Sequence, residues 1–196
     1  MSKLKFIDLF SGCGGFSEGF YQEGFESIVH VDFDAPACET VKERMRFYNY
    51  PKKTIEKAVI CGDLTSEDVH KQIDNVIQNT EIDVLVGGPP CQTFSSVGRA
   101  QDSNSMRNDP RNYLFRSYLE ILEKHQPKIF VFENVSGLLS AKPNGNYIFP
   151  EIIESMSEYY SVCDDRETIL LNSVHYGVPK IRKRVINIDK VYEYID

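Results

Sequence analysis

A run of apolar residues passes directly into a stiff turn in the stretch Ile82-Asp83-Val84-Leu85-Val86-Gly87-Gly88-Pro89-Pro90-Cys91-Gln92. The apolar run is typical of a buried strand, and the two prolines fix φ in the turn that follows it. Ligands of open α/β sheets bind at the carboxyl ends of the strands. The glycines beside Cys91 allow a ligand to come close. We therefore interpret Cys91 as a displayed nucleophile rather than as a cysteine that a structural turn happens to contain.

Strand and helix patterns alternate on both sides of this stretch, which predicts an α/β fold with a parallel, helix-covered sheet. We expect strands at residues 4–9, 27–32, 58–60, 82–86, 128–133, 168–171 and 184–188. We expect helices at residues 17–23, 35–46, 65–78, 113–126 and 148–158. Asp34 is expected to cap the second helix, and Thr65 with Asp68 to form a capping box for the third. Residues 92–110 lack periodicity and predict a long surface loop, which in a compact domain is usually functional.

The composition is that of one globular domain. The chain has 196 residues, of which 41% are hydrophobic and 26% charged, and no apolar run is long enough to span a bilayer. Its N-terminus has no signal-peptide pattern. The five cysteines form no CxxC pair, so neither a disulfide framework nor a metal site is predicted, and a reducing compartment is expected. The net charge of −7 restricts any contact with nucleic acid to local basic patches.

A second glycine-rich turn, Asp8-Leu9-Phe10-Ser11-Gly12-Cys13-Gly14-Gly15-Phe16, lies between the first predicted strand and the first predicted helix. Asp32 ends the next strand about 20 residues later, where an acidic side chain can hydrogen-bond ribose hydroxyls. The Gly-Cys-Gly-Gly pattern fits the GxGxxG dinucleotide fingerprint poorly, so the kind of nucleoside stays open, as does a tight turn without a ligand. Asp63, at the end of the third strand, can meet an adenine amino group or simply cap a helix.

Four segments of the chain resemble, in order, hallmark motifs of the cytosine-C5 DNA methyltransferases. They are Phe6-Ile7-Asp8-Leu9-Phe10-Ser11-Gly12-Cys13-Gly14-Gly15-Phe16, Gly88-Pro89-Pro90-Cys91-Gln92-Thr93-Phe94-Ser95, Phe132-Glu133-Asn134-Val135 and Tyr176-Gly177-Val178-Pro179-Lys180-Ile181-Arg182-Lys183-Arg184. One such segment would be weak evidence, but four in sequence order are specific. The resemblance implies a Rossmann-like, S-adenosylmethionine-dependent methyltransferase fold. Such a fold has a mostly parallel twisted sheet with helices on both faces and a late antiparallel strand, here in a single catalytic domain over residues 1–196.

The resemblance also implies the cofactor, S-adenosylmethionine, with S-adenosylhomocysteine as its product. Phe10 is expected to pack on the adenine, Asp32 to bind the ribose, and Phe33 with Asp63 to complete the adenosine pocket. The turn glycines are expected to shape the methionine end. The remaining cofactor-binding residues that we expect are Asp8, Gly12, Gly14, Gly15, Pro89 and Leu114.

The reaction that the resemblance implies explains the choice of catalytic residues. A thiolate at Cys91 adds to C6 of cytosine and turns C5 into a carbon that can attack a sulfonium methyl group. Glu133 is expected to hold N3 and the exocyclic amine, although alone it could be a strand-end cap. Arg182 and Arg184 should point to opposite faces, one towards the base or Glu133 and the other towards DNA or a structural carboxylate. We assign Arg182 to the base and Arg184 to DNA, against the alternative of a solvated basic edge.

The target base must leave the duplex stack before it can react, and the loop after Cys91 is the natural lid over it. In this loop we expect DNA contacts from Gln92, Ser95, Ser96 and Arg99. Arg107 and Arg111 either contact phosphates or only solubilise the segment.

The match to the family has two departures. Lys180 replaces the usual glutamine before the Arg-x-Arg element, and the target-recognition region and two further family segments do not follow. We therefore expect either a truncated chain or a split enzyme whose second polypeptide supplies the rest. Residues 1–196 alone are expected to bind the cofactor weakly and to show little sequence-specific methylation.

Three functions are compatible with these observations. The first is the catalytic part of a restriction-modification DNA (cytosine-5-)-methyltransferase. It would act on duplex DNA in a prokaryotic cytoplasm, associated with the nucleoid through DNA and without membrane contact. The second keeps the chemistry and changes the substrate to tRNA. The third is a non-catalytic subunit, against which Cys91, Glu133 and Arg182 together argue.

Overall fold

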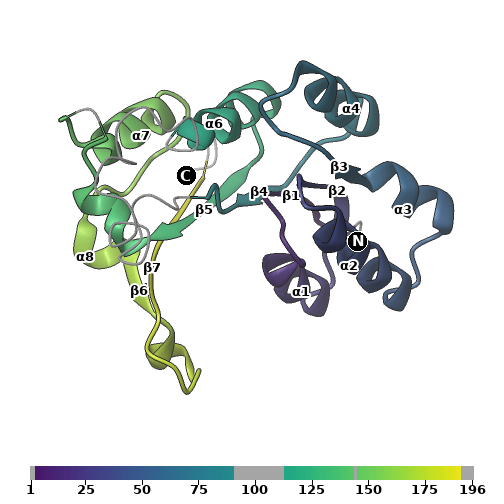
Figure 1. The fold of residues 1–196 in the computed structure, drawn as a ribbon, viewed down its shortest axis with the longest axis horizontal. Coiled ribbons are helices and arrows are strands. Elements are labelled where there is room, and N and C mark those ends of the chain that lie inside the picture. The colour runs from purple at the N-terminus through teal and green to yellow at the C-terminus, as the bar shows by residue number, and fades with distance from the viewer. Residues whose placement is uncertain (1–2, 91–112, 144, 191–196) are drawn as a thin grey trace.

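A seven-stranded sheet forms the centre of the computed structural model, which describes residues 3–90, 113–143 and 145–190 (Figure 1). Its strands are β1 (Lys5–Leu9), β2 (Glu26–Asp32), β3 (Val59–Cys61), β4 (Val84–Gly87), β5 (Ile129–Val135), β6 (Leu170–Asn172) and β7 (Lys183–Lys190). They lie in the order β3-β2-β1-β4-β5-β7-β6, and β1 to β5 are parallel. β7 runs antiparallel to both of its neighbours, so the prediction of a mostly parallel sheet with a late antiparallel strand is confirmed.

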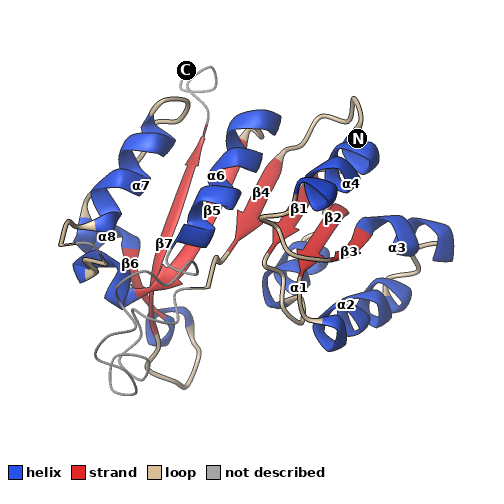
Figure 2. Cartoon of the chain, turned by 45° about the horizontal axis from the view of Figure 1, so that its top comes forward, coloured by secondary structure: helices blue, strands red, loops and turns tan. Residues whose placement is uncertain are grey.

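Helices cover both faces of this sheet (Figure 2). α1 (Gly15–Gln22), α2 (Ala35–Phe47) and α3 (Lys52–Ala58) lie on one face, and α4 (Glu67–Ile77), α6 (Leu114–His125) and α7 (Ile148–Ser157) on the other. Successive side chains of a strand point to opposite faces. Phe6 accordingly joins the buried cluster of Val41 in α2, whereas Ile7 joins that of Ile73 in α4 and Tyr118 in α6. The two cores fix the carboxyl ends of the parallel strands along one edge.

The predicted helices and strands are present, and four short elements were not predicted. They are α3, the single turn α8 (Arg166–Ile169) and the 3₁₀ helices η3 (Ser136–Ser140) and η4 (Ser173–Tyr176). α3 buries only Ile55 and Ala58, too few residues to produce a periodic pattern. Asp165 caps α8 by accepting from the Thr168 N–H at 2.9 Å, which shortens the strand predicted at 168–171. No helix in the described residues is long and apolar enough to cross a membrane.

The two predicted helix caps have different outcomes. Asp34 is the N-cap of α2, with Oδ2 accepting from the Ala37 N–H at 3.1 Å, as predicted. The capping box of Thr65 and Asp68 is wrong, because Ser66 is the N-cap of α4 and its Oγ accepts from the Asp68 N–H at 3.3 Å.

The loop predicted after Cys91 lies outside the described residues. Cys91, the predicted nucleophile, also lies outside them, as do Gln92, Ser95, Ser96 and Arg99, which we expect to contact DNA, and Arg107 and Arg111, for which two roles were left open. These assignments remain predictions.

Candidate active site

The glycine turn after β1 contains residues in the left-handed backbone conformation and is hydrogen-bonded to β2. The backbone φ is 56° at Phe10, 51° at Gly12 and 81° at Gly14, a region that glycine adopts readily and other residues rarely. The Gly12 N–H donates to Asp32 Oδ2 at 2.7 Å, and Asp32 Oδ1 accepts from the Asp34 N–H at 2.9 Å. Asp32 therefore holds the turn and the start of α2 in one arrangement.

A cavity of about 500 Å³ opens beside this turn. It is lined by Phe10, Val31, Asp32, Phe33, Gly62, Asp63, Leu64, Thr65, Pro90 and Leu114. These residues lie in or after β1, β2, β3 and β4, at the carboxyl edge where α/β sheets bind ligands. The Phe33 side chain is 72% exposed, so its ring is free to cover a ligand. An apolar cavity with two carboxylates is typical of a small-molecule site.

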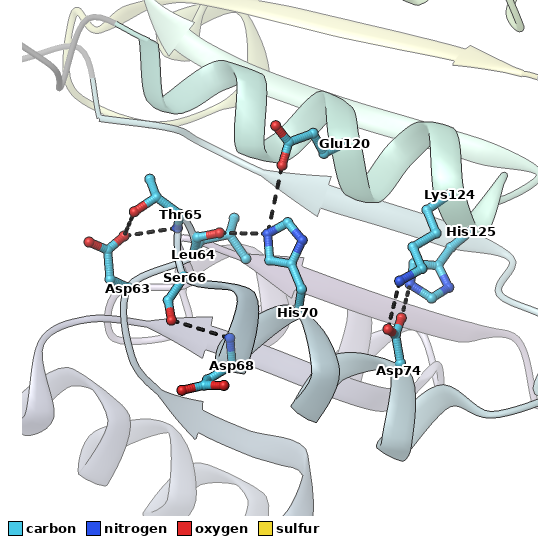
Figure 3. Close-up of polar contacts among 10 residues, drawn as sticks. All are labelled: Asp63, Leu64, Thr65, Ser66, Asp68, His70, Asp74, Glu120, Lys124 and His125. Carbon is cyan, nitrogen blue, oxygen red and sulfur yellow. Dashed lines mark hydrogen bonds and ion pairs between the residues drawn. The ribbon is translucent and has the colours of Figure 1, made fainter.

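Asp63 reaches the cavity from the segment before α4 (Figure 3). Its Oδ1 accepts hydrogen bonds from the N–H and the Oγ1–H of Thr65, both at 2.9 Å. Asp63 caps neither α4 nor any other helix in the described residues, because the cap of α4 is Ser66. A local turn therefore orients the carboxylate that faces the cavity.

Polar contacts between α4 and its neighbours fix this wall of the cavity (Figure 3). His70 Nε2 lies 2.7 Å from the carbonyl oxygen of Leu64. Asp74 Oδ2 pairs with Lys124 Nζ at 2.6 Å, which joins α4 to α6, and Asp74 Oδ1 lies 3.3 Å from His125 Nε2. Burial lowers the pKa of His125, against a smaller opposing effect of Asp74.

The two glycines before Pro89 make room for other parts of the protein. A Cβ on Gly87 would lie 2.9 Å from the backbone oxygen of Leu9 and from the ring of Tyr118. A Cβ on Gly88 would lie 2.8 Å from Glu133 Oε2. These glycines therefore let β4 and the turn pack against β1, α6 and Glu133.

Glu133 and Arg184 meet beside this turn. β5 and β7 are antiparallel with Val135 opposite Arg184, and Arg184 Nε lies 2.6 Å from Glu133 Oε1. About a quarter of each side chain is exposed, 22% for Glu133 and 24% for Arg184, so the pair is mostly buried but still in contact with solvent. Next to them the buried Asn134 donates from Nδ2 to the Pro89 carbonyl oxygen at 3.1 Å. The acidic strand end and the proline turn are thus held together.

Comparison with known proteins identifies the family. A model of the C-5 cytosine-specific DNA methylases matches residues 4–191. This chain belongs to that family. The resemblance that the four motifs indicated is therefore confirmed.

Individual relatives agree with this family. Type II methyltransferase M.Bpa9945I of Bacillus paralicheniformis is 34% identical over 92% of this chain and 52% of its own length. Type II methyltransferase M.DdeI of Desulfomicrobium norvegicum is 39% identical over 93% of this chain and 39% of its own length. A crystal structure from E. coli, described as a prophage-encoded DNA modification methyltransferase, superposes with a TM-score of 0.72 at 28% identity, over 97% of this chain and 47% of that one. The chain thus spans about half the length of these methyltransferases, or less.

The arginine pair is placed differently from our assignment. Arg184, which we assigned to DNA, forms the ion pair with Glu133. Arg182, which we assigned to the base, precedes β7 and is exposed on the hairpin that projects from the body (yellow in Figure 1). The register decides this, because Arg184 is the residue of β7 that pairs with the end of β5. Residues two apart in an extended segment lie on the same face, so the opposite faces that we expected for the two arginines do not follow from their spacing.

Several predicted cofactor residues line the cavity, and others lie behind it. Phe10, Asp32, Phe33, Asp63 and Leu114 line it directly. Gly12 shapes the turn, whereas Gly14 and Gly15 border a groove between α1 and α2. Asp8 is buried beneath the turn, and its carboxylate accepts from the Ser17 hydroxyl. Pro90 lines the cavity in place of Pro89, whose carbonyl Asn134 binds.

Four further residues line the cavity and were not predicted from the sequence: Val31, Gly62, Leu64 and Thr65. Val31 and Leu64 are apolar residues in the core pattern, so nothing in the pattern separates them from other buried residues. Gly62 and Thr65 flank Asp63 and could have been found by extending the site one or two residues along the chain.

The cavity has the features that S-adenosylmethionine needs. Phe10 and Phe33 offer aromatic surface for an adenine ring, and Asp32 and Asp63 offer acceptors for hydroxyl and amino groups. The carboxylates also favour a ligand with positive charge. The family implies this cofactor, and the residues present fit it.

Proposed function

We propose that this chain carries the cofactor-binding and catalytic part, as one domain, of a DNA cytosine-C5 methyltransferase. One observation supports this most strongly. Pro90 borders the cofactor-sized cavity, while the neighbouring Pro89 is bound through its carbonyl to Asn134, next to Glu133. The residue that follows this turn in the sequence is Cys91. A single turn therefore links the methyl-donor cavity, the acidic strand end and the proposed nucleophile.

In this proposal the cofactor supplies an electrophilic methyl group when bound. Asp32 accepts from the ribose hydroxyls and Asp63 from the adenine amino group, while Phe10 and Phe33 exclude water from the adenine. Asp32 already accepts the Gly12 N–H, so its orientation is set before the ligand arrives. Such preorganisation reduces the cost of ordering side chains on binding.

The cytosine half of the reaction falls to Cys91, Glu133 and Arg184. The Cys91 thiolate forms a bond to C6 of the flipped base, C5 takes the methyl group, and loss of the C5 proton lets the thiolate leave. Glu133 holds N3 and the exocyclic amine. Arg184 orients the Glu133 carboxylate from 2.6 Å, and its charge favours the electron density that builds up on the ring.

Cofactor binding is the first test, measured by titration calorimetry of the chain with S-adenosylmethionine. Asp32→Ala should weaken binding by about tenfold or more, because it removes both the ribose acceptor and the anchor of the turn. The control is Asp34→Ala, which removes the cap of α2 but leaves its backbone N–H for Asp32. Equal affinity of Asp32→Ala and the parent chain would contradict the assignment of this cavity.

The substrate is tested with the protein purified from its natural source, together with any chain that accompanies it. Transfer of tritiated methyl groups should occur to duplex DNA and not to tRNA, since the family is one of DNA methylases and the relatives are bacterial Type II methyltransferases. We place the reaction in the bacterial cytoplasm for the same reason. Transfer to tRNA alone would replace DNA by RNA in this proposal, and transfer to neither would favour a non-catalytic subunit.

A further inference from the structure

A line of buried polar side chains lies beneath the cofactor turn. Asp8 and Ser17 are each 1% exposed, and His30 is fully buried. Ser17 Oγ donates to Asp8 Oδ2 and lies 3.3 Å from His30 Nδ1. His30 Nε2 lies 2.9 Å from the hydroxyl of Tyr21, which lies 2.9 Å from Ser27 Oγ. Polar groups are rarely buried in such a number without a reason.

These hydrogen bonds can be given a direction. Burial lowers the pKa of His30 to about 3, so its ring is neutral and has one donor and one acceptor nitrogen. The Ser17 hydroxyl donates its proton to Asp8, so the Ser17 oxygen accepts from His30 Nδ1–H. Nε2 must then accept from the Tyr21 hydroxyl, and Tyr21 in turn accepts from Ser27. Every donor in the line therefore points towards Asp8.

Asp8 has one oxygen bound and one unsatisfied. Its Oδ2 accepts from Ser17, whereas Oδ1 is buried without a hydrogen-bond partner among the described residues. The titratable groups that face it are Tyr21 from α1 and His30 and Asp32 from β2, while β4 contributes the apolar Val86 opposite. Burial raises the pKa of Asp8 to about 7, against the lowering effect of the Ser17 hydrogen bonds and with a smaller raising effect of Asp32.

We propose that Ser17, His30 and Tyr21 are positioning residues of the cofactor turn. They hold Asp8 as a hydrogen-bond acceptor at the start of α1, and they carry away its proton when a cationic methyl donor binds. This inference rests on the proposed function. The ionised carboxylate accepts from both the N–H and the hydroxyl of Ser17, the third residue of α1, and so fixes the end of the turn. A protonated Asp8 donates to Ser17 instead. Ser17 then donates to His30 Nδ1, His30 Nε2–H to Tyr21 and Tyr21 to Ser27, which is the other histidine tautomer. When Asp8 ionises, Asp8, Ser17, His30 and Tyr21 each pass one proton to the next group, and one proton leaves at the Ser27 hydroxyl.

The first experiment measures the affinity for S-adenosylmethionine against pH. Because only the ionised form is competent, the dissociation constant should rise by up to about tenfold per pH unit below the midpoint. Ser17→Ala removes a donor to the carboxylate and should move the midpoint to higher pH. Tyr160→Phe is the control, since it removes a buried hydroxyl that donates to the Pro127 carbonyl in the other core and should leave the midpoint unchanged. Identical midpoints for Ser17→Ala and the parent chain would overturn the inference.

The second experiment needs no cofactor. Nitrogen NMR of the free protein, with the signals of His30 identified by their loss in His30→Gln, should show the Nδ1–H tautomer above about pH 8 and the Nε2–H tautomer below about pH 6. One tautomer at both pH values would contradict the proton relay. If the protein binds no S-adenosylmethionine at any pH while the tautomer still switches, the proposed function fails and the relay stands.

Discussion

Gly88 shows how one missing side chain organises the candidate active site. Glu133 Oε2 occupies the space that a Cβ on Gly88 would enter, at 2.8 Å, and Glu133 Oε1 meets Arg184 on its other side. The carboxylate is thus held between a backbone and a guanidinium group. A methyl group at position 88 cannot be added without moving the carboxylate.

Gly88→Ala should therefore lower kcat/KM for methyl transfer by about 100-fold, the effect of displacing a catalytic group by about an ångström. Cofactor affinity should change little, because Gly88 does not line the cavity. Gly19→Ala is the matched control, since a Cβ there meets nothing within 4 Å and alanine favours the helix. Unchanged turnover in Gly88→Ala would show that the position of Glu133 is not critical.

The two arginines allow a second test at single residues. Arg184→Ala leaves Glu133 without its partner at 2.6 Å and should lower kcat by about 100-fold. Arg182→Ala, on the exposed hairpin, should leave kcat nearly unchanged and affect only the KM for DNA. Steady-state kinetics on duplex DNA distinguishes the two. The opposite pattern would restore our assignment from the sequence, with Arg182 at the base.

At the level of the secondary-structure elements, two adjacent residues at the start of α4 have different roles. Ser66 caps the helix, whereas Thr65 lines the cavity. Ser66→Ala removes the N-cap and should lower the free energy of unfolding by about 1 kcal/mol, measured by urea denaturation. Thr65→Ala removes a hydrogen bond to Asp63 and should weaken cofactor binding by about twofold to tenfold with a smaller effect on stability. Equal losses of stability in the two variants would contradict the assigned cap.

The long elements could be predicted from the sequence because their patterns are strong. α6 buries Phe115, Tyr118, Ile121 and Leu122 at helical spacing, and β4 is a continuous, buried apolar run. α8 and the cap at Ser66 could not, because each depends on one local hydrogen bond for which a neighbouring residue could also compete. Thr65 has the same capping chemistry as Ser66, and only its contact with Asp63 decides between them.

At the scale of the whole molecule, the candidate site joins segments that are far apart in the sequence. The glycine turns, Asp32 and Asp63 could be predicted because each follows a strand at the same sheet edge. The pairing of Glu133 with Arg184 could not, since it depends on the register between β5 and β7. The buried relay from Tyr21 to Asp8 could not be predicted from the sequence either, because serine, histidine and tyrosine give no apolar pattern that marks them as core residues.

Global stability should depend on pH through Asp8. Its pKa is raised by burial from 3.8 to about 7, so its contribution to stability is complete below about pH 4 and is lost as the pH rises through 7. Over that window the stability of the cofactor-free protein relative to Asp8→Asn should fall with pH, by at most about 1.4 kcal/mol per pH unit. Denaturation at several pH values measures the difference. A difference that does not vary with pH would contradict the buried, protonated Asp8.

The most direct measurement for the whole account is covalent trapping. Duplex DNA that contains 5-fluorocytosine is incubated with S-adenosylmethionine and the natural protein, with any chain that accompanies it, because fluorine at C5 blocks release of the enzyme. Mass spectrometry of the digested adduct should find the base and the transferred methyl group attached to Cys91, and Cys91→Ser should give no adduct while still binding the cofactor. No adduct with the unaltered protein, or an adduct on Cys13, Cys38, Cys61 or Cys163, would contradict the proposed active site.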